Sequence, residues 1–189
     1  RHLPSAAGFT LIDMVVTVTL ICILGGIAVA SLKDVSDSMR LGQAAREVER
    51  ELQTARLKAV TSNRPIRVRF NCPSAGGYRM VELLGSSTVP IADDSALNRC
   101  QESAYPFPAA DRNPMTLPNH DGPPRSLHPS VTFGATRTLE FWPNGTVHVD
   151  EGLSGEWPQL PPAGTAITVV KGTATKTITV NGLGKIQLQ

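Results

Sequence analysis

The stretch GFTLID at residues 8–13 leads directly into MVVTVTLICILGGIAVASL at residues 14–32. This second segment runs for 19 residues without a charged side chain. As a helix it would be about 28 Å long, which is just enough to cross the hydrocarbon core of a bilayer. The sequence therefore predicts a membrane-spanning helix near the start of the chain.

The residues that precede this helix help to decide between several kinds of apolar N-terminal segment. A cleaved secretory signal has a shorter apolar stretch, and its small-residue cleavage site lies on the far side of that stretch. Here the small residues, SAAG at 5–8, come first. A simple anchor or an uncleaved signal does not account for Asp13, because a carboxylate near the start of a membrane segment is costly and usually functional. Asp13 could instead cap the helix, since Asp favours the positive N-terminal end.

The junction resembles the class III signal of type IV prepilins and type II secretion pseudopilins. The resemblance implies that prepilin peptidase removes a leader, residues 1–8, by cutting after Gly8, and that it N-methylates the new terminal residue, Phe9. It also implies that Asp13 serves filament assembly by pairing with the terminal amine of a neighbouring subunit. The family normally has Glu at this position, so the charge is kept while the reach is one methylene shorter.

The helix is expected to continue beyond the apolar segment. Apolar residues recur at alternating steps of four and three, at Leu41, Ala45, Val48, Leu52, Ala55 and Ala59. This spacing places them on one helical stripe. We therefore expect a membrane and filament-core helix at residues 9–33 and an amphipathic continuation at residues 34–62, together about 80 Å long.

From residue 63 onwards the apolar period changes to two. Ile66, Val68 and Phe70 share one face of a strand, and Arg67 and Arg69 lie on the other, which is typical of a half-buried strand. Similar runs lie at residues 78–84, 137–142, 146–150, 166–171, 176–181 and 185–189.

Two short segments between these runs favour tight antiparallel hairpins, PNG at 143–145 and NG at 181–182. The expected fold class is α+β, with a long N-terminal helix packed on an antiparallel β-sheet domain at residues 63–189. Within that domain, residues 85–130 hold eight prolines and no sustained period, so this segment is expected to be irregular and to lie at the surface or be disordered.

Three further segments indicate one family among these prepilin-like proteins. They are ARLKAVTSNRPIRVRF at 55–70, LEFWPNGTV at 139–147 and ITVNGLGKIQLQ at 178–189. They are similar to the GspH/FimT family of minor pseudopilins and minor pilins. The resemblance implies a pilin-like fold, a single pass through the bacterial inner membrane and a C-terminal domain in the periplasm. The implied partners are the prepilin peptidase/N-methyltransferase, other major and minor pseudopilins, and the inner-membrane assembly platform.

The cysteines divide by compartment. Cys22 lies in the apolar helix, whereas Cys72 and Cys100 belong to the part that the resemblance places in the oxidising periplasm. No C-x-x-C or zinc-like spacing is present. A Cys72–Cys100 disulfide is therefore favoured over a metal site.

The sequence shows no constellation typical of an active site. The four histidines are scattered, and neither a G-x-S-x-G elbow nor a phosphate-binding loop is present. We therefore expect neither an enzyme nor a cofactor or metal. The net charge of +2 also lacks the large positive excess of a dedicated duplex-DNA binder.

Two functions use the same assembly chemistry: a minor pseudopilin of a type II secretion pseudopilus, and a minor pilin that binds DNA during natural transformation. DNA-binding members of the family resemble one another in a C-terminal Gly-Arg-x-Arg motif, but residues 184–187 read GKIQ here. Lys185 keeps one of the two charges, and Lys171 and Lys176 are further candidate contacts. The pseudopilin is favoured and nucleic acid is not.

Overall fold

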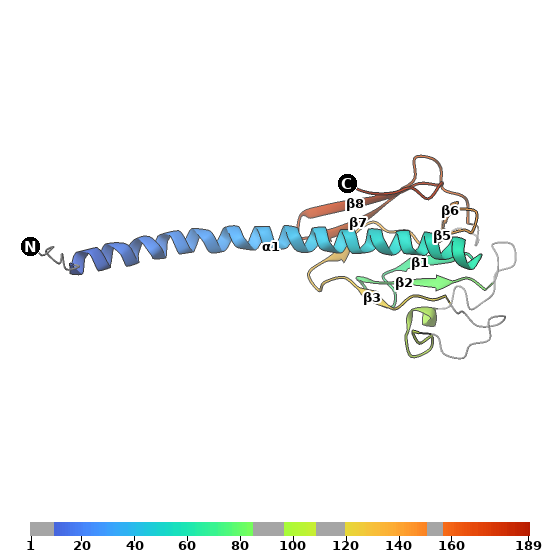
Figure 1. Cartoon of the computed structure of the whole chain (residues 1–189), viewed down its shortest axis with the longest axis horizontal. Coiled ribbons are helices and arrows are strands. Elements are labelled where there is room, and N and C mark those ends of the chain that lie inside the picture. The colour runs from blue at the N-terminus through green and yellow to red at the C-terminus, as the bar shows by residue number, and fades with distance from the viewer. Residues whose placement is uncertain (1–9, 85–96, 109–119, 151–156) are drawn as a thin grey trace, which may run out of the picture. The chain divides into compact units, whose positions relative to one another are not determined.

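The computed structural model describes residues 10–84, 97–108, 120–150 and 157–189, with backbone alone at residues 27–31. Its first element is the helix α1, Leu11–Ser62. The chain divides into two compact units, Arg1–Met39 and Arg40–Gln189, and α1 contributes to both (Figure 1). The helix ends at Ser62, as the sequence pattern predicts, because Asn63 adopts a left-handed conformation with φ of 53° and Pro65 disfavours helix at the residue before it.

In the second unit, the predicted stripe of α1 forms the centre of the core. All six residues of the stripe are buried, and Ala44 joins them. Except for Ala45, these residues pack in one cluster with apolar side chains from the strands, among them Ile66, Phe141, Ile167 and Ile178. Each fully buried aliphatic or aromatic side chain contributes about 1.5–3 kcal/mol relative to exposure, so this stripe holds α1 on the β-domain.

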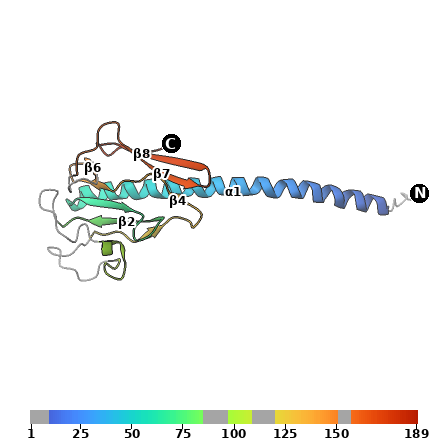
Figure 2. The same cartoon turned by 180° about the vertical axis from the view of Figure 1, so that it is seen from behind.

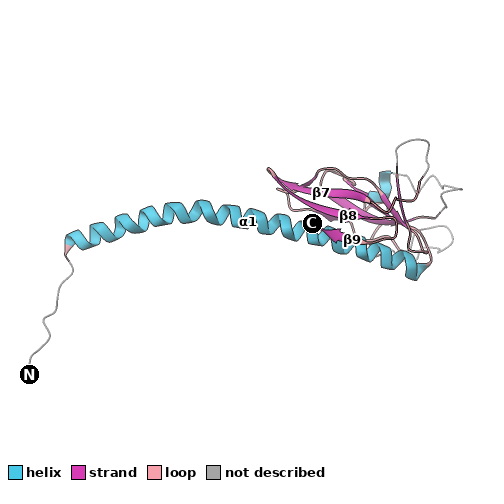
Figure 3. Ribbon diagram, turned by 90° about the horizontal axis from the view of Figure 1, so that it is seen from above, coloured by secondary structure: helices cyan, strands magenta, loops and turns pink. Residues whose placement is uncertain are grey.

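In the described residues, nine strands follow the helix in two antiparallel sheets. The first sheet contains β1 Ile66–Phe70, β2 Gly77–Glu82, β3 Arg125–Ser126, β5 Leu139–Phe141 and β6 Val147–Val149, in the order β3-β2-β1-β5-β6. The second contains β4 Thr132–Phe133, β7 Thr165–Lys171, β8 Ala174–Val180 and β9 Ile186–Leu188, in the order β4-β7-β8-β9. Figures 1 and 2 show both sheets beside the last part of α1, and in Figure 3 β9 lies next to that helix.

The predicted hairpins are confirmed. β5 pairs with β6 through Phe141 and Val147, and the turn between them has Gly145 at a φ of 84°, which glycine adopts without a steric penalty. β8 pairs with β9 through Val180 and Ile186. The α+β fold class inferred from the periodicity is therefore correct.

The expectation for residues 85–130 is wrong in one respect. Residues 85–96 and 109–119 lie outside the described part of the chain. The remaining residues include a 3₁₀ turn at Leu97–Cys100 and the short strand β3, and several of their side chains are buried rather than at the surface. The buried set includes Arg99, Cys100, Tyr105, Asp121 and Leu127.

Candidate functional site

Thr10 and Asp13 form a reciprocal cap at the start of α1. The amide and the hydroxyl of Thr10 donate to Asp13 Oδ2 at 3.2 and 2.6 Å, and the Asp13 amide donates to Thr10 Oγ1 at 3.4 Å. This is the arrangement of a capping box, which satisfies backbone donors that a helix start leaves unpaired. The carboxylate is exposed, so it remains accessible to a neighbouring group. Gly8 and Phe9 lie outside the described residues.

The first part of α1 exposes a long series of apolar side chains. Each is between 51% and 83% exposed, and the series comprises Leu11, Ile12, Met14, Val15, Val16, Val18, Leu20, Ile21, Ile23, Leu24 and Leu32. Exposed apolar surface of this extent is typical of a region that contacts another protein or a membrane. The expected span at residues 14–32 includes residues 27–31, whose side chains are not described.

In the part of the chain that the structure describes, no helix combines the length and the apolar character needed to cross a bilayer.

Cys72 and Cys100 form a disulfide, with their Cα atoms 5.4 Å apart. Both residues are buried. The bond joins the segment after β1 to the 3₁₀ turn, and Cys22 is an exposed free thiol on α1. The disulfide therefore fixes part of the proline-rich segment to the first sheet.

Arg79 on β2 binds the same segment from inside the protein. Its side chain is fully buried and donates to three backbone carbonyls, those of Gly122 at 2.8 Å, Arg99 at 2.9 Å and Tyr105 at 2.7 Å. A buried guanidinium can satisfy several carbonyls at once because its donors are arranged in a fixed fork. Arg79 thus fixes the backbone at three positions of this segment against β2.

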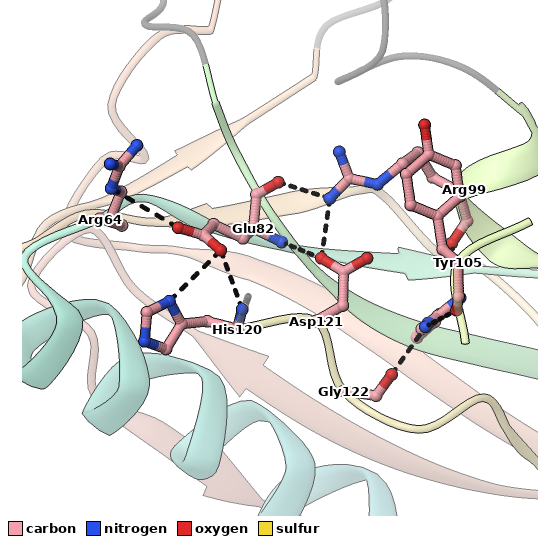
Figure 4. A network of polar contacts seen from close by, with 8 residues as sticks. Arg64, Glu82, Arg99, Tyr105, His120, Asp121 and Gly122 are labelled. Atoms are coloured by element: carbon pink, nitrogen blue, oxygen red, sulfur yellow. Dashed lines mark hydrogen bonds and ion pairs between the residues drawn. The ribbon is translucent and has the colours of Figure 1, made fainter. Parts of the chain in front are cut away.

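A second buried arginine completes this network, which is shown in Figure 4. Arg99 Nη2 donates to Asp121 Oδ1 at 2.7 Å and to the Glu82 carbonyl at 2.6 Å. Asp121 Oδ1 also accepts the Glu82 amide at 2.8 Å. The Glu82 carboxylate lies 3.5 Å from Arg64 Nε and accepts the His120 amide at 2.8 Å. The network links α1's end, β2 and the segment after residue 97.

This network was not predicted from the sequence. Its members come from a strand and from a segment without periodicity, so no spacing marks them as neighbours. The one available signal was the adjacency of Arg99 to Cys100, because a disulfide to Cys72 brings Arg99 next to the first sheet. Its side chains bind one another and the backbone of neighbouring segments, which indicates a structural role rather than a reactive one.

Glu51 is a buried carboxylate on the core-facing side of α1. Its Oε2 lies 2.9 Å from Arg125 Nε, while Oε1 is buried without a hydrogen-bond partner among the described residues. Burial raises the pKa of the Glu51 carboxyl above its ordinary value of 4.5, and the Arg125 guanidinium opposes this only in part. The charged form of Glu51 is thus less stable in the folded protein than in water.

Glu51→Gln should therefore stabilise the fold at neutral pH, because the native pKa lies above the unfolded one. The folded state gains from protonation of Glu51 below about pH 4.5, and this gain is lost as pH rises through the native pKa. The free energies of unfolding of the wild type and the variant should be similar in acid and diverge above that range, with the variant more stable. Urea titrations between pH 3 and pH 8 measure this difference. A variant less stable than the wild type at pH 7 would show that the Arg125 pair outweighs burial.

Arg67 does not face solvent as the half-buried strand pattern implied. It is only 7% exposed, and its Nη2 and Nε bind Glu140 Oε1 at 2.6 and 3.2 Å across the β1–β5 pair. The Trp157 ring covers its guanidinium at 3.9 Å. The second face of β1 is covered at this position, so Arg67 is not available to a phosphate backbone.

The three candidate DNA-binding lysines do not form one patch. Lys171 and Lys176 lie at the β7–β8 turn, where Lys171 pairs with Ala174 and Lys176 with Val169. Lys185 lies at the other end of β8, where its carbonyl accepts the Asn181 amide at 3.1 Å. Lys176 and Asn181 are five positions apart along an extended chain, which is about 17 Å. The structure therefore brings Lys171 and Lys176 together but places Lys185 apart from them.

Lys185 instead lines an apolar groove between α1 and the turn before β9. The groove has a volume of about 580 Å³, and its walls include Arg56, Leu57 and Val60 from the helix and Lys185 and Ile186 from the strand side. A volume of this size is within the range of ligand-binding clefts. We refer to these five residues as the C-terminal groove.

Among the described residues, no group of three or more His, Cys, Asp or Glu is placed to hold a metal ion.

Comparisons with known proteins relate the chain to one family. Residues 44–184 match the family model described as type II transport protein GspH. No curated protein matches the chain. Among solved structures, the chain is similar to the type IV minor pilin FimU of Pseudomonas aeruginosa, with 17% identity and a TM-score of 0.48 over 82% of this chain and 91% of that chain. It is also similar to the minor pseudopilin EpsH from the type 2 secretion system of Vibrio cholerae, with 10% identity and a TM-score of 0.44 over 79% of this chain and 96% of that chain.

Proposed function

We propose that this chain, which belongs to the GspH family of type II transport proteins, is a minor pseudopilin. In this role it is a structural component of the pseudopilus of a type II secretion system and carries out no catalysis. The observation that carries the proposal is the family match, which extends over residues 44–184 and so includes the last part of α1 and the strands from β1 to β8.

The proposal includes a processing and assembly pathway. Prepilin peptidase would cut after Gly8 and methylate Phe9, and the N-terminal helix would anchor the protein in the inner membrane with its β-domain in the periplasm. The exposed apolar side chains of α1 support this pathway, because lipid or neighbouring subunits would cover them. Other pseudopilins and the inner-membrane assembly platform would then draw the subunit into the filament.

Mass spectrometry of the protein purified from membranes tests the proposal. We expect the mature chain to begin at Phe9, with one added methyl group, and a strain that lacks the gene to retain its secreted enzymes inside the cell. A chain that keeps residues 1–8, or one that is cut beyond Leu32, would refute the processing step. Normal secretion in the deletion strain would refute the role in the pseudopilus.

A DNA-binding minor pilin is the second candidate, and one observation favours it. Lys185 lines the same groove as Arg56, so two cations lie on one surface of the described chain. Against it, Lys171 and Lys176 lie at the far end of β8, and Arg67 is buried against Glu140. The described cations therefore offer few phosphate contacts in one place.

Titration of the full chain in detergent with labelled duplex DNA distinguishes the two candidates. Each phosphate contact contributes about 0.9 to the slope of log affinity against log salt, so two contacts at the groove give a slope of about −2. We expect a dissociation constant weaker than micromolar at near-physiological salt. Micromolar or tighter binding that is lost in Lys185→Ala would instead establish the DNA-uptake pilin.

A further inference from the structure

The C-terminal groove has apolar walls that the described protein leaves open. Leu57 and Val60, one turn apart on α1, are 66% and 51% exposed, and Ile186 is partly buried opposite them. Leu183, in the turn beside the groove, is also largely exposed. Apolar side chains gathered around one hollow and bordered by charges are typical of a protein interaction site.

A specific contact fixes the shape of this groove. Arg56 Nη2 donates to the Leu183 carbonyl at 3.4 Å, which ties the turn before β9 to the helix. Gly184 has a φ of 74°, and a Cβ at this position would lie 2.6 Å from Arg56 Nε. Glycine is therefore required both for the backbone conformation and for the close approach of Arg56. The groove is thus formed in the isolated chain.

The charge of the groove restricts its occupant. Its described lining contains the cations Arg56 and Lys185 and no Asp or Glu. A complementary ligand therefore carries carboxylates or phosphates beside an apolar group. Two copies of this chain meeting groove to groove would bring like charges together, which disfavours a symmetric dimer through this surface.

A protein segment fits this surface better than nucleic acid does. Duplex binding depends on many phosphate contacts, and two cations supply few. The exposed Leu57 and Val60 side chains would gain little from a phosphate backbone, whereas they would be desolvated by an aliphatic or aromatic side chain of a protein. The combination favours an apolar anchor with acidic residues on either side.

We infer that the C-terminal groove docks a segment of a different pilin-like subunit of the same filament, one that presents an aliphatic or aromatic side chain flanked by Asp or Glu. This inference rests on the proposed function, since it takes the neighbour to be a filament subunit. It places a lateral contact on the β-domain in addition to the assembly contacts of the N-terminal helix.

The test places a photo-crosslinking amino acid, benzoylphenylalanine, at position 57 of the full-length chain in cells. After irradiation, the crosslinked peptide is sequenced by mass spectrometry. We expect a discrete adduct with a different chain that has a prepilin-type N-terminus, through a peptide with an apolar residue flanked by acidic ones. An adduct with nucleic acid, an adduct between two copies of this chain, or no adduct at position 57 would overturn the inference.

Variants at the groove provide the matched controls. In a chain with the crosslinker at position 60, Leu57→Asp and Lys185→Glu should each reduce the adduct about tenfold or more, because they remove apolar contact or repel carboxylates. Lys185→Arg should retain it. Thr54→Asp adds the same charge to an exposed helix position outside the groove and should have little effect. Equal loss in Thr54→Asp and Leu57→Asp would contradict a specific site.

The inference and the proposed function can fail separately. If the Leu57→Asp chain is cleaved at Gly8, enters filaments and supports secretion as the wild type does, then the docking site is wrong and the pseudopilin role stands. If the wild-type chain keeps its leader and its deletion leaves secretion normal, then the role itself is wrong.

Discussion

Replacing Arg79 with methionine should lower the free energy of unfolding by about 3–5 kcal/mol, because three backbone carbonyls would lose a charged donor inside the protein. Methionine fills a similar volume but has no N–H group. A buried ion pair can often be replaced by apolar side chains without loss. That compensation fails here, since the acceptors are main-chain groups that remain buried and polar.

Thermal unfolding of the full chain in detergent, followed by near-ultraviolet circular dichroism, measures this effect. For a domain of this size, the midpoint should fall by roughly 10 °C. Arg137→Met is the matched control, since Arg137 is exposed and the same change there should alter stability by less than about 0.5 kcal/mol. A midpoint within 2 °C of the wild type for Arg79→Met would show that the disulfide and the Arg99–Asp121 pair hold the segment without Arg79.

The elements of this fold were predictable because local spacing encodes them. A stripe such as Leu41, Val48 and Leu52 identifies a helix face whatever packs on it, and all three residues are buried. The hairpins follow from short turns whose backbone needs glycine, as at Gly145. These features depend on neighbours a few residues apart, so one sequence is sufficient to identify them.

The sequence did not predict that other segments of the chain cover the second face of the first sheet. Period-two alternation indicates which side chains share a face, but it does not show what lies over that face. Arg67 and Arg79 follow the alternation and yet are buried. The Trp157 ring covers Arg67. Arg79 is buried because it binds the backbone carbonyls of Arg99, Tyr105 and Gly122. These covering segments have no period of their own, so their position depends on tertiary contacts alone.

The candidate site also combines a feature that local spacing predicts with features that depend on tertiary contacts. The Thr10–Asp13 cap depends on residues three apart, and a helix-capping role for Asp13 could be considered from the sequence. The groove depends on Arg56 and Leu183, which are 127 positions apart. The relative positions of the lysines could not be predicted either, because only the strand register shows that β8 separates Lys176 from Lys185.

Removing the charge of Asp13 should reduce incorporation into filaments by about two orders of magnitude. If this carboxylate pairs with the amine of a neighbouring Phe9, its loss leaves that amine unpaired in an apolar environment, at a cost of roughly 3 kcal/mol. The informative variant is Asp13→Asn, because its side-chain oxygen can still accept from Thr10 while the charge is absent. Shearing filaments from cells and measuring the subunit by immunoblot gives the readout.

Two further variants separate pairing from capping in this experiment. Thr10→Ala breaks the reciprocal cap but keeps the carboxylate, so it should assemble nearly as the wild type does, with a loss of about 1 kcal/mol in helix stability. Asp13→Glu keeps the charge with one more methylene of reach, so incorporation should be equal or higher. If instead Thr10→Ala fails to assemble and Asp13→Asn succeeds, the carboxylate acts only as a helix cap. The relative amounts of the three variants in filaments therefore decide which role Asp13 has.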